Sequence, residues 1–294
     1  MRKHAYLIMA HDAPDLLIML VKLLDSEFHD IYIHIDKKTD GIDECVIKKA
    51  VSRSGIAFVE RRDINWGGYS QIETELALLS EAVKYHYSYY HLLSGHDLPL
   101  RTADQIYNFF ENSGKNYVNF REKSNDIARR IKYYRVFQER RARDKWLWSK
   151  LEAVSIKVQD VLHIDRTTSL KDSNIAYGSQ WFSITHELAC YICRMKDETK
   201  KIYRYGRCVD ELFVQSLIAN SKKDWNLAYP PDNHNFYTCM RQIDWDRGNP
   251  YIFQSMDYRE LMESNCMFAR KFDLKKDKEI CSMIFNELLS NERS

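Results

Sequence analysis

Two adjacent carboxylates, Asp210 and Glu211, open a stretch with a helical pattern that runs to Ala219. At a helix start, one acidic side chain can cap free backbone N–H groups while its neighbour points beyond the helix. We expect Asp210 to cap and Glu211 to project, so that Glu211 could take a proton from a hydroxyl as a general base. Ordinary acidic residues of a helix N-terminus have the same spacing, so the pair alone does not establish catalysis.

Two adjacent cations, Arg270 and Lys271, stand between Phe268 and Phe272. Cations in a half-buried aromatic setting suit an anionic ligand, such as the diphosphate of a departing nucleotide. If the segment is a strand, Arg270 and Phe272 share one face and Lys271 lies on the other, which is the structural alternative.

A nucleotide could be held by Asp36, which ends the strand-like run Ile33–Ile35. A carboxylate there can bind ribose hydroxyls or a uracil N–H, although it could equally cap a turn. His11 also directly follows a strand-like run and is a second candidate for nucleotide binding. The G-x-G-x-x-G and P-loop patterns are absent, which argues against Rossmann dehydrogenases and P-loop enzymes.

A metal site is not expected. Asp244 and Asp246 match the Asp-x-Asp pattern of metal-dependent transferases, but they lie in a late, loop-rich stretch and are read as structural. His34, His91 and His96 are too irregularly spaced to indicate a zinc site.

The first hundred residues alternate between strand and helix patterns, which predicts an α/β fold with a mostly parallel central sheet and flanking helices. The expected strands are Ala5–Ala10, Ile31–Ile35, Ile56–Val59 and Tyr89–Leu93. The expected helices are Pro14–Leu24, Val46–Val51 and Gln71–Tyr85. We expect Asp12 to cap the first of these helices and Ser70 to cap the last. Ligands of such sheets bind at the carboxyl ends of the strands, where His11, Asp36 and Asp97 all fall.

The remainder of the chain is less regular. Asp126–Val161 is largely helical, and basic residues outnumber acidic ones between Arg129 and Lys150, with aromatic residues interleaved. A strand is expected at Tyr177–Ile184, and helices at Glu187–Met195 and Lys275–Leu289.

Composition narrows the classes of function. A chain of 294 residues, 45% of them hydrophobic, suits one large domain. The formal net charge of +2 indicates no nucleic-acid partner. Seven scattered cysteines are typical of reduced thiols, and no leader or long apolar run is apparent, so we expect a cytoplasmic protein whose membrane contact would be peripheral.

Several ordered blocks together resemble glycosyltransferase family 14, the core-2/I-branching β-1,6-N-acetylglucosaminyltransferases and peptide O-xylosyltransferases. The similarity covers nearly the whole chain. The blocks are Ile33–Lys37, Asn65–Ser70, Leu92–Leu100, Gly178–Phe182, Asp210–Glu211, Met240–Trp245 around Arg241, and Phe268–Phe272.

The resemblance implies a GT-A-like fold in one catalytic domain over 1–294, with a nucleotide-binding half at 1–100 and an acceptor and catalytic half at 101–294. It implies a UDP-sugar donor, N-acetylglucosamine or xylose, transferred with inversion to a glycan hydroxyl without a metal or other cofactor. Within it Glu211 corresponds to the catalytic base, Arg270 and Lys271 to the diphosphate-binding cations, and His11 and Asp36 to the nucleotide site. Sugar or acceptor contacts are assigned to Trp66, Asp97, Gln180, Trp181 and Arg241.

Neither the transmembrane stem nor the disulfides of animal members are apparent in this sequence, so we expect a bacterial-type member acting in cell-surface polysaccharide synthesis. The acceptor could be lipid-linked, with the basic Arg129–Lys150 segment in peripheral contact with the inner membrane. Two other readings remain open: a non-catalytic nucleotide-sugar or glycan-binding module, and a metal-dependent hydrolase that uses His96 and Asp97.

Overall fold

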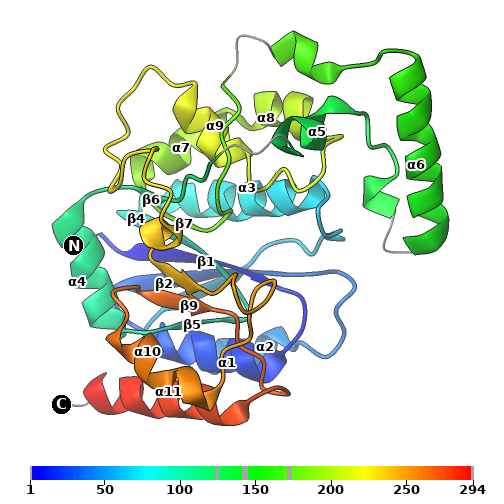
Figure 1. Cartoon of the computed structure of the whole chain (residues 1–294). Helices are drawn as coiled ribbons and strands as arrows, with labels where there is room; N and C mark the ends of the chain where they lie inside the picture. The colour runs from blue at the N-terminus through cyan, green and yellow to red at the C-terminus, as the bar shows by residue number, and fades with distance from the viewer. Residues whose placement is uncertain (1, 123–125, 141–144, 171–173, 293–294) are drawn as a thin grey trace.

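The computed structural model describes residues 2–122, 126–140, 145–170 and 174–292. Its centre is a six-stranded sheet in the order β3-β2-β1-β4-β7-β6 (Figure 1). The strands are β1 (His4–Ala10), β2 (His29–Ile35), β3 (Gly55–Phe58), β4 (Tyr89–Ser94), β6 (Tyr117–Val118) and β7 (Phe182–Thr185). The first four run parallel and β7 runs antiparallel between β4 and β6, which confirms the mostly parallel α/β sheet.

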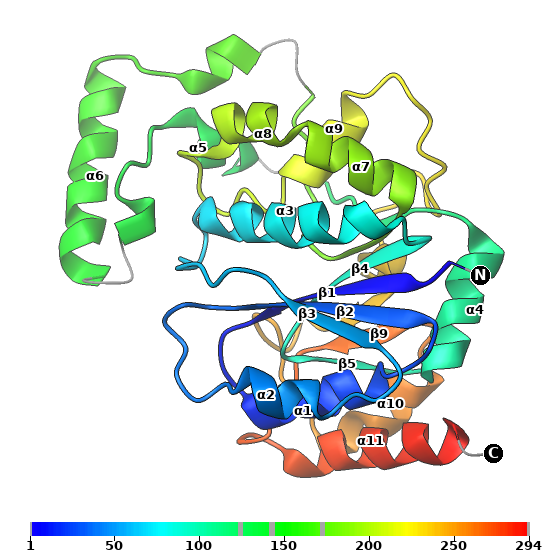
Figure 2. The same cartoon turned by 180° about the vertical axis from the view of Figure 1, so that it is seen from behind.

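Helices cover both faces of this sheet (Figures 1 and 2). One layer contains α3 (Ser70–Ala82), α7 (His186–Arg194), α8 (Lys196–Tyr203) and α9 (Phe213–Ala219). The other layer contains α1 (Pro14–Leu23), α2 (Glu44–Lys48), α10 (Tyr258–Glu263) and α11 (Lys278–Glu292). The helix α4 (Ala103–Ser113) lies along one end of the sheet. Each face has its own apolar core, because successive residues of β1 point to opposite sides: Leu7 joins one core and Ile8 the other. This double coverage explains the unbroken apolar sequence of β1.

A second sheet of three short strands, in the order β5-β9-β8, was not predicted from the sequence. Its strands are β5 (Asp97–Pro99), β8 (Arg241–Ile243) and β9 (Phe268–Arg270). In the antiparallel pair of β5 with β9, Asp97 lies opposite Arg270. The late cationic segment is thereby fixed beside residues that follow β4.

The segment between β6 and β7 carries α5 (Asp126–Lys132) and α6 (Lys145–Val161), in agreement with the helical prediction. In both views α6 stands at the outer edge of the molecule (Figures 1 and 2). Two of the basic residues between Arg129 and Lys150, Arg141 and Arg143, lie outside the described residues. Among the described residues, no helix combines the length and apolar character that crossing a bilayer requires.

Short 3-10 turns complete the chain: η1 (Val83–Tyr85), η2 (Gln138–Arg140), η3 (Arg166–Leu170), η4 (Phe236–Cys239) and η5 (Ser255–Asp257). The predicted strand over Tyr177–Ile184 is shorter than expected, since β7 begins at Phe182 and Tyr177 forms only an isolated bridge with Arg121.

The cap predicted at Ser70 is wrong. The helix α3 begins at Ser70 itself, and its side chain makes no capping bond. Instead, the Glu139 carboxylate accepts hydrogen bonds from the Ser70 backbone N–H at 3.0 Å and from its hydroxyl at 2.8 Å. An acidic side chain from η2 therefore stabilises the N-terminus of α3. A Cβ at Gly68 would lie 2.5 Å from that carboxylate, so a larger residue there would force the Glu139 side chain to move.

Candidate active site

A pocket of about 230 Å³ opens at the carboxyl ends of β1, β2 and β4. Its walls are Met9, Ala10, His11, Asp36, Ile64, Trp66, Gln71, Ser94, Gln180, Trp181 and Arg270. The structure thus brings together six predicted site residues from distant parts of the sequence: His11, Asp36, Trp66, Gln180, Trp181 and Arg270. Their position agrees with the expectation that ligands of a parallel sheet bind at the carboxyl ends of its strands.

Asp36 lies at the floor of this pocket, directly after β2, and is 5% exposed. Its Oδ1 accepts a hydrogen bond from the Lys38 backbone N–H at 2.9 Å, so the carboxylate also holds a turn. The structural and the nucleotide-binding readings of Asp36 are therefore compatible, because the same carboxylate lines the pocket.

Arg270 also lines the pocket, and its position is fixed by two contacts. Its guanidinium donates to Asp97 Oδ1 at 2.8 Å and stacks over the Trp181 ring, with its central carbon 4.5 Å from the ring centroid. Asp97 itself is fully buried, and its second oxygen accepts from the Ser94 backbone N–H. Asp97 does not line the pocket, so its predicted contact with sugar or acceptor has no support in this geometry; the carboxylate orients Arg270.

Lys271 follows β9 directly and is not among the residues that line the pocket. Its charge, with that of Arg270, nevertheless reaches His11: burial first, and then the neighbouring cationic groups, hold the pKa of His11 below its ordinary value despite the opposing charge of Asp12. The two cations therefore lie near His11, at one edge of the pocket.

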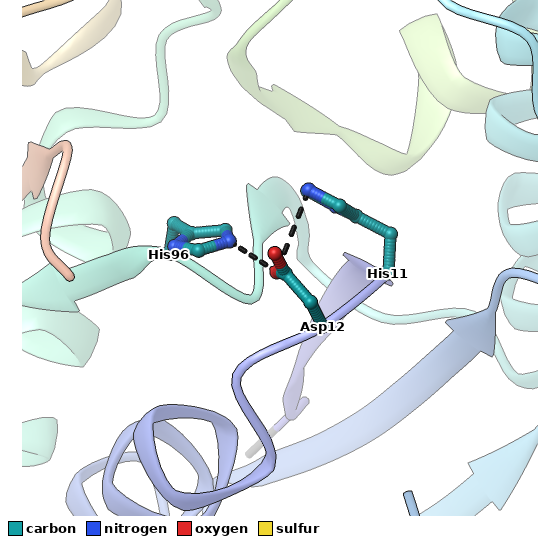
Figure 3. Close-up of side chains that lie close together, drawn as sticks. All are labelled: His11, Asp12 and His96. Atoms are coloured by element: carbon teal, nitrogen blue, oxygen red, sulfur yellow. Dashed lines mark hydrogen bonds and ion pairs between the residues drawn. The ribbon is translucent and has the colours of Figure 1, made fainter. Parts of the chain in front are cut away.

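Three side chains at this edge, His11, Asp12 and His96, offer ligand atoms that lie within 4.8 Å of one another (Figure 3). His96 is buried, and its Nδ1 donates to the Phe272 carbonyl, which directs Nε2 at the Asp12 carboxylate. The predicted cap by Asp12 is wrong for this reason: its carboxylate bonds to His96, and Ala13 takes the N-cap position of α1 without a side-chain bond. Two histidines and a carboxylate could hold a divalent cation.

The Asp-x-Asp pattern forms a turn, as its structural reading expected. Asp244 Oδ1 accepts from the backbone N–H groups of Asp246 and Arg247, both at 2.9 Å, and its other oxygen is bonded by the Arg247 side chain. Local hydrogen bonds thus occupy Asp244, the first carboxylate of the pattern.

Glu211 lies in the turn before α9 and not within the helix. Its backbone carbonyl accepts from Gly178 N–H at 3.0 Å, and position 178 requires glycine because a Cβ there would lie 1.9 Å from the Asn119 carbonyl oxygen. The half-exposed carboxylate pairs with Arg130, whose Nη1 lies 2.6 Å from Glu211 Oε2. Glu211 does not line the pocket of Asp36 and Arg270.

The predicted capping role of Asp210 is wrong, because α9 begins only at Phe213. Asp210 is buried instead and accepts a hydrogen bond from Gln71 Nε2 at 3.3 Å. Burial, with the charge of Glu211 added, raises the pKa of Asp210 to about 7. Since Gln71 also lines the pocket, this side chain connects the pocket wall to the turn that carries Glu211.

Of the residues expected to contact sugar or acceptor, Trp66 is 76% exposed at the pocket rim, where an indole face could stack on a sugar. Arg241 is fully buried. Its guanidinium donates to the carbonyls of Leu92, Phe182 and Cys239 and to the Ser183 hydroxyl. The structure therefore does not support the predicted ligand contact of Arg241, because this arginine joins β4, β7 and β8 and does not reach the pocket.

Comparison with known proteins decides the family. The model of the Core-2/I-Branching enzyme family matches residues 4–268. The chain belongs to this family.

Family relatives include human xylosyltransferase 2, which is 25% identical over 304 residues, and rat xylosyltransferase 1, which is 24% identical over 311 residues. These alignments cover 95% and 98% of the chain but 33% and 35% of the relatives, so the chain spans about a third of their length. Mouse xyloside xylosyltransferase 1 aligns structurally over 90% of the chain and 96% of its own, with 9% identity and a TM-score of 0.38.

Two residues of this family member's site were missed from the sequence. Gln71 is the residue directly after the Asn65–Ser70 block, so a block one residue longer would have included it. Arg130 lies in the basic segment, and only the fold shows that it is the arginine that meets Glu211.

Proposed function

We propose that the chain is an inverting glycosyltransferase that moves a sugar from a UDP-sugar to a glycan hydroxyl. The observation that carries this proposal is the convergence of Asp36 and Arg270 on one pocket, with Glu211 in an adjacent turn linked to that pocket through Asp210 and Gln71. A non-catalytic binding module could keep the cations to bind its nucleotide, but it would not need the base. The similarity to xylosyltransferases favours xylose as the transferred sugar, with N-acetylglucosamine as the alternative.

In this mechanism Asp36 holds the ribose or uracil of the donor. The acceptor hydroxyl oxygen attacks the anomeric carbon while Glu211 removes its proton. The bond between that carbon and the diphosphate oxygen breaks with both electrons left on the oxygen, so UDP departs. Arg270 and Lys271 stabilise its negative charge, and the attack from the opposite side inverts the configuration.

We further propose that Arg270 and Lys271 make a metal ion unnecessary. Arg270 is held against Trp181 and Asp97, so little reorganisation is needed as the diphosphate charge develops. The His11–Asp12–His96 cluster is the alternative location for a cation, and its involvement can be tested separately.

The decisive experiment is a screen of UDP-sugars for slow hydrolysis, followed by transfer to an oligosaccharide acceptor. One UDP-sugar should be consumed with release of UDP, and proton NMR should show a product of opposite anomeric configuration to the donor. Retained configuration would refute the single displacement, and the absence of turnover with every donor, despite UDP binding, would favour the binding module.

We also propose that the protein acts at a membrane surface in polysaccharide synthesis, on an acceptor that could be lipid-linked. The supporting feature is α6, which exposes an apolar stripe at helical spacing: Leu147, Leu151, Val154, Val158 and Val161. Lys150 lies over the Trp146 ring at 3.8 Å, so a cation and an exposed tryptophan flank the stripe. This combination suits the interface of an anionic bilayer.

A further inference from the structure

A second pocket, of about 410 Å³, lies beside Glu211 and is separate from the one that contains Asp36. Its walls are Arg129, Arg130, Arg135, Arg207 and Cys208. Like charges gathered in one hollow repel one another, so this arrangement costs free energy unless anions balance it.

Only part of that charge is balanced by protein carboxylates. Arg130 pairs with Glu211 at 2.6 Å and Arg135 with Glu152 at 3.6 Å. For the side chains of Arg129 and Arg207, the described part of the chain provides neither a hydrogen bond nor a carboxylate. Cys208 adds no negative charge, because burial, followed by the charge of Asp210, raises the pKa of its thiol.

The pocket is built by fixed backbone contacts. The Arg207 backbone N–H donates to the Arg130 carbonyl at 2.9 Å, which joins α5 to the loop before α9. Arg130 also donates to the Cys208 carbonyl at 3.0 Å and stacks on Tyr177, with its central carbon 5.0 Å from the ring centroid. The arginines are therefore presented by segments that are tied together, and Arg130 belongs both to the pocket and to the Glu211 ion pair.

We propose that this arginine-lined pocket is an acceptor subsite that binds an anionic group, a phosphate or a carboxylate, carried by the glycan whose hydroxyl is presented to Glu211. The inference rests on the proposed transferase function and adds the chemical class of the acceptor. Guanidinium groups bind both anions through paired hydrogen bonds, and the volume has room for a charged sugar unit. Because Arg130 touches Glu211, an anion in the pocket would lie next to the base.

The first experiment measures binding of inorganic pyrophosphate by calorimetry, with UDP present at saturation so that the donor pocket is occupied. Arg129→Gln/Arg207→Gln should weaken this binding roughly tenfold or more, because charge-assisted hydrogen bonds are lost. The matched control Arg53→Gln/Arg259→Gln removes two exposed arginines elsewhere on the surface and should bind as the wild type does.

A thermal melt separates binding from folding. Without ligand the double variant should melt no lower than the wild type, since neither side chain makes a hydrogen bond or an ion pair in the described structure. Pyrophosphate should raise the melting temperature of the wild type and the control but not of the variant. Equal pyrophosphate binding by variant and control, or none by the wild type once UDP is present, would overturn the proposal.

The second experiment compares transfer to one oligosaccharide in three forms: neutral, phosphorylated and carrying a uronic acid. The wild type should show a higher kcat/KM for one charged form, which distinguishes phosphate from carboxylate, and the variant should bring the ratio of charged to neutral acceptor towards one. Turnover with no preference for either charged form would refute only the acceptor inference. No turnover of any UDP-sugar would instead refute the transferase function, and the pyrophosphate titration would still decide whether the pocket binds anions.

Discussion

Glu211 combines two properties that a general base needs: its carboxylate is half-exposed, and its backbone is fixed by Gly178. We therefore expect Glu211→Gln to preserve UDP binding but to lower transfer by roughly two to four orders of magnitude, since the amide cannot take the proton. Steady-state turnover and calorimetry with UDP measure the two effects. Glu187→Gln, at an exposed acid that also forms an ion pair, is the control, and near-normal turnover in Glu211→Gln would remove Glu211 from the mechanism.

Lys271 should contribute to nucleotide affinity through one charge-assisted contact with the diphosphate. Lys271→Ala is expected to weaken UDP binding by roughly 1.5–3 kcal/mol, about ten- to a hundredfold in Kd. The exposed Lys275, four residues later, provides the control substitution Lys275→Ala. Unchanged UDP affinity in Lys271→Ala would leave Arg270 as the single cation of the proposed leaving-group site.

Removal of metal ions tests whether Arg270 and Lys271, or a metal ion at the His11–Asp12–His96 cluster, balance the charge of the diphosphate. Activity should persist in excess EDTA, because Arg270 and Lys271 already supply positive charge at the pocket edge. If EDTA abolished activity and manganese restored it, Asp12→Asn should then abolish the recovery, whereas Asp246→Asn should not, since Asp244 already serves a local turn.

The sequence predicted which residue types meet in the pocket but not which of them are buried. Asp36, Arg270 and Trp181 could be assigned because each falls in a distinctive block. Arg241 falls in an equally distinctive block, yet it bonds backbone carbonyls inside the protein. A charged residue in a motif can serve a ligand or the fold, and only its burial separates the two cases.

At the scale of secondary-structure elements, the turn before α9 should make stability depend on pH through Asp210. Asp210 has a pKa of about 7 in the fold, against 3.8 in its absence, because burial disfavours its charged form. Between about pH 4 and 7 the folded state therefore keeps a proton that the unfolded chain has lost, and the free energy of unfolding falls as pH rises through this range.

Asp210→Asn removes this titration. At pH 8 the free energy of unfolding of the variant should exceed that of the wild type by up to roughly 4 kcal/mol, so the variant should melt at a higher temperature. At pH 5 the two proteins should differ little. Thermal melts at both pH values measure the effect, with the exposed Asp232→Asn as control. A variant that is destabilised equally at both pH values would show that the carboxylate is needed in its charged form.

The long elements were predictable because their pattern is strong: β1 is apolar throughout, and α3 has a helical period. The small β5-β9-β8 sheet was not, since three-residue strands carry no periodicity and their pairing depends on contacts between distant parts of the chain. The caps expected at Ser70 and Asp12 failed for a related reason, because Glu139 and His96 approach from elsewhere in the fold.

At the scale of the whole molecule, the exposed stripe of α6 should determine membrane association. At low salt the wild type should sediment with anionic liposomes, and at high salt a smaller fraction of it should sediment. Val154→Glu/Val158→Glu places charge on the stripe and should abolish this sedimentation, whereas Val46→Glu/Met256→Glu, at exposed positions elsewhere, should not. Equal recovery with neutral and anionic liposomes would contradict the membrane proposal.

The pairing of Asp97 with Arg270 has a consequence for the order of events during synthesis. The pocket takes His11 and Asp36 from early in the chain, whereas Arg270 joins it only through β9. A ribosome makes the early strands first, and they can form their parallel pairs while the cationic segment is still inside the exit tunnel. The nascent chain can therefore assemble the floor of its pocket before it has the arginine wall, and we expect UDP affinity to arise only once that last segment emerges.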